Sequence, residues 1–291
     1  MKKCDICPRK CNVNRELNVG FCNSSNNIKV AKVMKHYWEE PIISGKNGSG
    51  AIFFSNCNLK CIFCQNYKIS SGEVGKEISI NELAKIFKDI EKSGVNNINL
   101  VSPTHYTEQI ISALKIYKPS IPIIWNSNGY EKPETIGLLK NYIDIFLVDL
   151  KFYDSNLSYE ICNARNYFEY ATMSILEMRK NQPKDIIVNN IMKKGIIIRH
   201  LVLPNCTSDS IKIIDWIKNN LGTKTIVSLM NQYTPYYKAL SHPFLNKKLK
   251  SLEYKRVLTY YINSGFEQGF SQSNESADEC YIPNFDCDLN I

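Results

Sequence analysis

Residues 57–66 read CNLKCIFCQN, with cysteines at positions 57, 61 and 64. The C-x3-C-x2-C spacing lets one loop bring three thiolates to a single inorganic centre. A structural zinc site is normally closed by four ligands, and neither a histidine nor a fourth cysteine lies nearby in the sequence. An iron–sulfur cluster also prefers four thiolates, so three cysteines leave one iron open to a ligand that is not protein. The stretch therefore predicts a cluster with one open iron.

This run resembles the cluster loop of radical S-adenosylmethionine (SAM) enzymes. Its Cys-Gln-Asn ending resembles the branch related to pyruvate formate-lyase activating enzymes, in particular an uncharacterised activase-like (PflX-type) group. The resemblance implies that Cys57, Cys61 and Cys64 ligate a [4Fe-4S] cluster whose open iron binds SAM. Reductive cleavage of SAM would give a 5′-deoxyadenosyl radical that abstracts hydrogen from a substrate. The resemblance further implies that Phe63 lies against the adenine and that Asn66 belongs to the SAM site.

A second group of cysteines, Cys4, Cys7, Cys11 and Cys22, precedes this loop. Four thiolates suffice to close a tetrahedral zinc site or to hold an auxiliary iron–sulfur cluster, and the spacing suits both. The segment resembles the N-terminal extension of the same activase-like group, which carries a similar C-x2-C-P-R-x-C element. We expect a second metal centre here, either zinc or an auxiliary cluster.

The remaining cysteines, Cys162, Cys206, Cys280 and Cys287, have no comparable spacing. We expect Cys162 and Cys206 to be buried or incidental thiols, because free cysteine behaves as a small hydrophobe. Cys280 and Cys287 lie in a polar, aromatic tail and receive no assigned role.

The cysteine count also bears on the compartment. Eleven cysteines in 291 residues are an odd number and far fewer than the ~8–10% of a disulfide scaffold. The N-terminus lacks the apolar stretch of a secretory signal, and no apolar run approaches the ~18 residues that would span a membrane. We therefore expect a cytoplasmic protein without membrane contact, where thiols more often hold metals than form disulfides.

Downstream of the cluster loop, short apolar runs alternate with segments of helical period, the pattern of a parallel α/β sheet. Ser79 to Glu82 predicts a capping box, and residues 207–221 predict a further helix that ends before Gly222. The resemblance extends this to a partial (β/α)6 TIM-like barrel. We expect a Cys-rich metal-binding extension over 1–45, the barrel over 46–265 and a tail over 266–291. The expected strands are 51–55, 97–101, 121–126, 145–151, 196–203 and 225–231.

Barrel enzymes gather their chemistry at the carboxyl ends of the strands. Alternation places Asp149 and Lys151 on one face, where the ammonium can pair with a SAM carboxylate. The resemblance implies further SAM contacts at the other strand ends. Asn126 stands where relatives carry an acid, so a monovalent cation site built on that acid is not expected by analogy. These further contacts are Ser102, Thr104, Ser127, Asn128, Arg199, Leu201 and Gln232.

The formal charge of +8, from 36 Lys and Arg against 28 Asp and Glu, could attract nucleic acid. Lys247, Lys248 and Lys250 better fit the solvated face of a helix, so nucleic acid is not an expected partner. The resemblance implies a flavodoxin or ferredoxin-type electron donor, and a glycyl-radical enzyme is one protein substrate that it suggests. Two alternatives stay open: a non-catalytic iron–sulfur or zinc redox protein, and a radical SAM enzyme that modifies RNA or peptides.

Overall fold

The computed structural model describes residues 3–272, 283, 285 and 287–290. Their strands form one sheet in the order β10-β9-β8-β6-β5-β4-β2-β1-β3, with β7 (Ile186–Val188) paired to β8. At the β3 end of this order, β1 (Ile28–His36) and β3 (Lys76–Ile78) are antiparallel to their neighbours. The parallel strands are β2 (Ser49–Phe54), β4 (Ile98–Val101), β5 (Ile123–Ser127), β6 (Ile145–Asp149), β8 (Ile191–Leu201), β9 (Ile226–Met230) and β10 (Gly269–Ser271).

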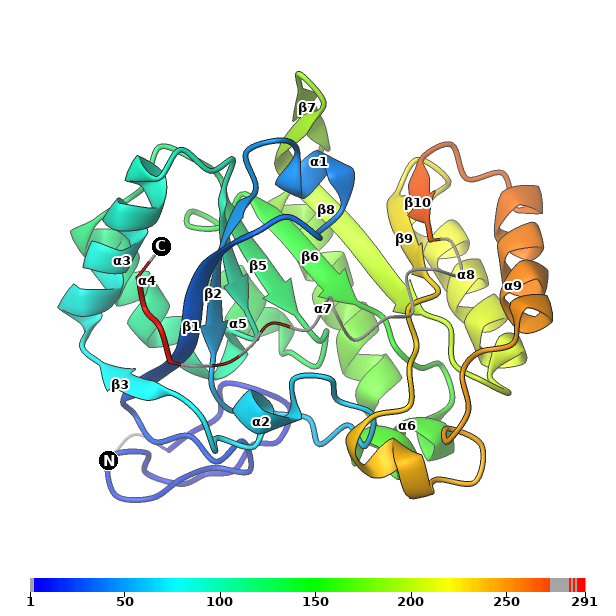
Figure 1. Ribbon diagram of the computed structural model, residues 1–291, viewed down its shortest axis with the longest axis horizontal. Coiled ribbons are helices and arrows are strands. Elements are labelled where there is room, and N and C mark those ends of the chain that lie inside the picture. The colour runs from blue at the N-terminus through cyan, green and yellow to red at the C-terminus, as the bar shows by residue number, and fades with distance from the viewer. Residues whose placement is uncertain (1–2, 273–282, 284, 286, 291) are drawn as a thin grey trace.

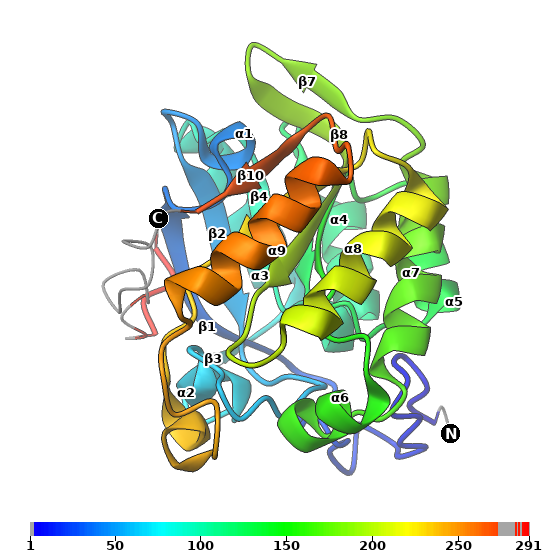
Figure 2. The same ribbon diagram turned by 90° about the vertical axis from the view of Figure 1, so that its right-hand side faces the viewer.

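Helices cover the outer face of this curved sheet and leave its inner face as a lumen (Figures 1 and 2). Figure 1 shows α1 (Pro41–Ser44) at one end of the sheet, and α2 (Tyr67–Ser70) and α6 (Ser155–Cys162) at the other. The chain is therefore a partial α/β barrel, as expected. The outer helices are α3 (Ile80–Lys92), α4 (Thr107–Ile116), α5 (Pro133–Gly137), α7 (Tyr167–Asn181), α8 (Thr207–Leu221) and α9 (Ser251–Asn263).

The local sequence signals account for the helix boundaries. The Ser79 hydroxyl accepts from the Glu82 backbone N–H at 3.2 Å, and the Glu82 carboxylate accepts from the Ser79 backbone N–H at 2.7 Å. This reciprocal capping box satisfies two of the N–H groups that a helix start leaves unpaired. At the other end of a helix, α8 stops before Gly222, whose φ of 82° is a left-handed conformation that glycine adopts without strain.

All six expected strands are present, and the structure adds elements that periodicity did not indicate. Strand β1 pairs with β2 from His36 opposite Ser49 to Val30 opposite Phe54, so part of the expected extension is integral to the sheet. Strand β8 begins at Ile191, earlier than expected, because it also forms a hairpin with β7. The division into an extension, a barrel and a tail stays a prediction.

Strand alternation sorts the side chains between two cores. On one face, Trp125, Phe146 and many other apolar side chains pack against the helices. On the lumen face, Ile124, Leu147 and Ile197 form a smaller apolar layer near α1. Nearer the carboxyl ends of the strands the side chains that face the lumen are polar, as expected where a barrel carries its functional site.

Several segments singled out from the sequence lie outside the barrel core. The basic run at 247–250 lies in the loop before α9 and not on its face, because the Lys250 backbone N–H caps the helix by donating to Glu253 at 3.3 Å. In the tail, the Asp288 carbonyl accepts from the Val33 backbone N–H at 2.9 Å. Cys287 is exposed, and Cys280 lies outside the described residues. Within the described ranges, no helix is long and apolar enough to cross a membrane.

Candidate active site

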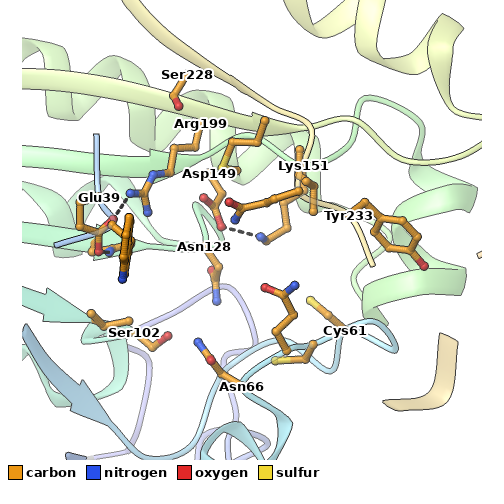
Figure 3. Close-up of a pocket in the computed structure, with 18 of the residues that line it drawn as sticks. Glu39, Cys61, Asn66, Ser102, Asn128, Asp149, Lys151, Arg199, Ser228 and Tyr233 are labelled. Atoms are coloured by element: carbon orange, nitrogen blue, oxygen red, sulfur yellow. Dashed lines mark hydrogen bonds and ion pairs between the residues drawn. The ribbon is translucent and has the colours of Figure 1, made fainter. Parts of the chain in front are cut away.

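A cavity of about 590 Å³ lies in the lumen toward the carboxyl ends of the strands (Figure 3). It collects nearly every side chain that the sequence nominated for the cluster and for SAM. The exception is Thr104, which is buried outside the lining and donates to the Glu131 carboxylate at 2.8 Å. The nominated residues that line the cavity are Cys57, Cys61, Phe63, Cys64, Asn66, Ser102, Ser127, Asn128, Asp149, Lys151, Arg199, Leu201 and Gln232.

The cysteine loop is held against the barrel by backbone hydrogen bonds to segments distant in sequence. The Ile62 N–H donates to the Ile161 carbonyl at 3.0 Å at the end of α6, and the Ile62 carbonyl accepts from the Ala239 N–H at 2.9 Å. Between them the loop turns back on itself, with the Cys64 N–H donating to the Cys61 carbonyl at 3.2 Å. These bonds fix a short coil so that its three thiols face one wall of the cavity.

The surroundings of these thiols fit an iron–sulfur cluster. Asn128 Nδ2 lies 3.3 Å from Cys57 Sγ, and the Ser70 hydroxyl lies 3.4 Å from Cys64 Sγ. Hydrogen bonds to ligand sulfurs are a normal feature of cluster sites. Burial raises the pKa of Cys57 to about 12 and that of Cys64 to about 11. The thiolates that a cluster needs would therefore depend on the positive charge of the iron.

Cys162, expected to be an incidental thiol, lies beside the loop. Its Sγ is 3.0 Å from Cys61 Sγ, and it is fully buried at the end of α6. Its isolated position, 98 residues after Cys64, gave no sign of this contact, because only the fold brings α6 to the loop.

Asp149 and Lys151 lie on one face, as their alternation predicted, and they pair with one another, with Lys151 Nζ 2.5 Å from Asp149 Oδ2. Burial opposes the charge on Lys151, but Asp149 outweighs it and holds the lysine pKa above its ordinary value. The Tyr167 hydroxyl braces this strand end by accepting from the Lys151 N–H at 3.0 Å. Gly129 lies against the same strand end, where a Cβ would lie 2.3 Å from the Asp149 carbonyl oxygen. Only glycine allows this approach.

Arg199 also lines the cavity, but its guanidinium is already bound by two acids. Arg199 Nε lies 2.8 Å from Glu40 Oε1, and Nη2 lies 2.7 Å from Glu40 Oε2 and also contacts Glu39 Oε2. Figure 3 shows Glu39 and Arg199 on one side of the cavity and Cys61 on another. Glu39 and Glu40 were given no role from the sequence, although two adjacent acids in a segment that precedes the cluster loop were an available signal.

The second cysteine group forms a separate element beside the cluster loop. Burial raises the pKa of Cys7 to about 12, and Cys4, Cys11 and Cys22 contribute to that rise through their nearby charges. Cys11 and Cys22 both approach Gly20, where a Cβ would lie 3.3 Å and 3.7 Å from their sulfurs. The four cysteines are thus neighbours in space as well as in sequence.

Arg9 ties this element to the cluster loop. Its Nε donates to the Asn58 carbonyl at 2.9 Å, and its Nη1 donates to the Asn163 carbonyl at 2.5 Å. The Phe21 ring lies 3.8 Å from the guanidinium carbon.

Across the described ranges, no three or more His, Cys, Asp or Glu side chains are gathered as a ready site for a single metal ion.

His105 is structural. It is fully buried, its Nε2 lies 2.8 Å from the Ser55 carbonyl, and burial lowers its pKa to about 3. It does not line the cavity.

Comparisons with known proteins agree with this geometry. Residues 51–200 match the family model of the radical SAM superfamily. An uncharacterized protein of Methanocaldococcus jannaschii is 35% identical over 273 residues, covering 88% of this chain and 73% of that protein. The crystal structure of Streptococcus suis SuiB bound to its precursor peptide SuiA shares the fold with a TM-score of 0.50 and 18% identity. That alignment covers 75% of this chain, which spans about half, 46%, of the SuiB chain. The chain belongs to the radical SAM superfamily.

Proposed function

We propose that the protein holds a [4Fe-4S] cluster on Cys57, Cys61 and Cys64 and binds SAM in the adjoining cavity. One observation carries the proposal: the three thiols line the same cavity as the Asp149–Lys151 pair. When bound, the cluster and SAM supply a 5′-deoxyadenosyl radical that abstracts hydrogen from a substrate. The family implies both cofactors.

The side chains of the cavity take complementary roles in this proposal. Lys151 offers an ammonium to the carboxylate of SAM, and Asp149 keeps that ammonium charged and oriented. Phe63, which packs edge-on against Tyr233 with ring centroids 6.0 Å apart, gives an apolar surface for the adenine. The Asn128 amide forms hydrogen bonds within the protein: it donates to Cys57 Sγ and, at 2.8 Å, to Asn58 Oδ1.

The test is anaerobic reconstitution with iron and sulfide, followed by addition of SAM and dithionite. Wild-type protein should form 5′-deoxyadenosine, and Cys57→Ala, Cys61→Ala and Cys64→Ala should each abolish it together with the cluster absorbance. Cys206→Ala is a matched control, since that thiol is buried outside the cavity lining. Activity that survives in all three loop variants would refute the assignment. SAM binding without 5′-deoxyadenosine in the wild type would favour a non-catalytic iron–sulfur protein.

We further propose that Cys4, Cys7, Cys11 and Cys22 hold a second metal centre, either zinc or an auxiliary cluster. Their proximity and the set of four thiols support this. Counting iron, sulfide and zinc per chain in the wild type and in a Cys4→Ala, Cys7→Ala double variant separates the two metals. A double variant with unchanged metal content would contradict the proposal.

The narrower assignment is to the activase-like, PflX-type group. Its support is the Cys-Gln-Asn ending of the loop and the four-cysteine extension that precedes it. In this assignment the protein works in a reducing, cytoplasmic setting and takes electrons from a flavodoxin or ferredoxin. A glycyl-radical enzyme is then the protein substrate to test, by electron paramagnetic resonance of a candidate partner after anaerobic incubation. Peptides and RNA are the alternative substrate classes within the superfamily.

A further inference from the structure

The side of the cavity away from the cysteine loop is acidic. Glu39 and Glu40 follow β1, at the end of the sheet where α1 lies, and their side chains are only 8% and 5% exposed. Both carboxylates contact the Arg199 guanidinium, and Glu40 uses both of its oxygens to do so. We call Glu39, Glu40, Arg199 and the neighbouring Asn99 the acidic floor.

The charges on the described lining of the cavity do not cancel. Asp149 and Lys151 neutralise one another, whereas two carboxylates of the floor share the single guanidinium of Arg199. His36 adds no compensating charge, because burial lowers its pKa. The lining therefore keeps one surplus negative charge.

A second observation concerns Asn99, the buried polar residue behind Glu39. Asn99 is fully buried, and its Nδ2 donates to Glu39 Oε1 at 2.7 Å, while its Oδ1 has no partner within the described part of the chain. Alternation along β4 places Asn99 on the same face as Val101, which lines the cavity. A buried acceptor without a donor is costly. Asn99 does not itself line the cavity, but Glu39, to which it donates, does, and the Glu39 carboxylate with the surplus charge favours a cation that carries N–H groups.

We propose that the acidic floor binds a positively charged nitrogen group of the substrate, an ammonium or a guanidinium. A divalent metal ion fits less well, because the Arg199 guanidinium already contacts both carboxylates and would repel it. Glu39 has room for a further donor, since a carboxylate offers about four acceptor sites and Asn99, Asn126 and Arg199 fill three. The proposal rests on the proposed function for the chemistry and adds the class of substrate.

The test compares small probes of the same shape on the cluster-loaded protein. Methylguanidinium is the cationic probe, N-methylurea its neutral isostere and acetate the anionic probe, with binding followed by calorimetry. We expect methylguanidinium to bind at least tenfold more tightly than N-methylurea. Equal affinity of the two in the wild type would overturn the proposal without any variant. Competition of Mn²⁺ with methylguanidinium for the site would also overturn it.

Variants then locate the site. Glu39→Gln removes the surplus charge and keeps the Glu40–Arg199 contacts, so it should abolish the tenfold preference, whereas Glu39→Asp should retain it. Glu177→Gln is a control, since that acid pairs with Lys180 on the protein surface. An unchanged preference in Glu39→Gln would overturn the proposal. Failure of the proposed function is distinguishable, because it appears as absent 5′-deoxyadenosine in the wild type and leaves the probe comparison intact.

Discussion

Replacement of Lys151 by methionine tests the centre of the proposed SAM site. Methionine keeps much of the length of the side chain but removes the ammonium, which lies 2.5 Å from Asp149 and is only 16% exposed. A charge-assisted hydrogen bond contributes about 1.5–3 kcal/mol. Since about 1.4 kcal/mol corresponds to a factor of ten in affinity, loss of the contact to a SAM carboxylate should weaken SAM binding by about 10- to 150-fold.

The same change should also cost stability, because it leaves Asp149 without its cation. Breaking a buried pair costs about 3–5 kcal/mol, and we expect ~2–3 kcal/mol here because Asp149 keeps 21% of its surface in water. Equilibrium dialysis with SAM and urea unfolding, both on cluster-loaded protein, measure the two effects. Lys132→Met is a matched control: Lys132 is 13% exposed and pairs with Asp5 at 2.7 Å outside the cavity. SAM affinity within twofold of wild type in a Lys151→Met protein with normal iron content would refute the reasoning.

Three further predictions concern the surroundings of the site. Air should oxidise cluster-free protein to a Cys61–Cys162 disulfide, since the two sulfurs are 3.0 Å apart; peptide mass spectrometry should detect the linked peptides, and Cys162→Ala should lack them. Burial lowers the pKa of His105 to about 3 and of His200 to about 4. As the pH falls, both histidines are therefore protonated in the unfolded chain before they are protonated in the folded protein. The contribution of these two histidines to stability should then be constant above pH 6.5, and stability should fall below it by up to ~1.4 kcal/mol per pH unit for each histidine; equal urea unfolding at pH 7 and pH 5 would contradict this. Arg9→Ala should speed iron release to a chelator several-fold, with Arg9→Lys intermediate, because it frees two carbonyls of the cluster region; identical release rates would show that the tie is dispensable.

Much of the site was predictable because its residues occupy regular positions. Asp149 and Lys151 needed only strand alternation, and the cysteine loop needed only its spacing. The parallel strands were similarly legible, because strands covered on both faces read as continuous apolar runs. These features depend on short-range sequence alone.

The parts that escaped prediction depend on long-range contacts. Cys162 meets Cys61 across 101 positions, and Arg199 meets Glu40 across 159. No local pattern marks such a pair, since each residue looks ordinary in its own segment. Thr104 shows the reverse difference: the resemblance implied a contact in the cavity, but in its 3-10 turn the Thr104 hydroxyl donates to Glu131.

Strand β1 also bears on where the protein can be divided. Its pairing covers the backbone edge of β2, whose six residues from Ser49 to Phe54 are all buried. A chain that began after β1 would present this strand, with Ile52, Phe53 and Phe54 in sequence, as an open template for pairing with other chains. Strand β1 therefore protects this edge of β2 from pairing with other chains, whether or not the cysteines that precede it hold a metal.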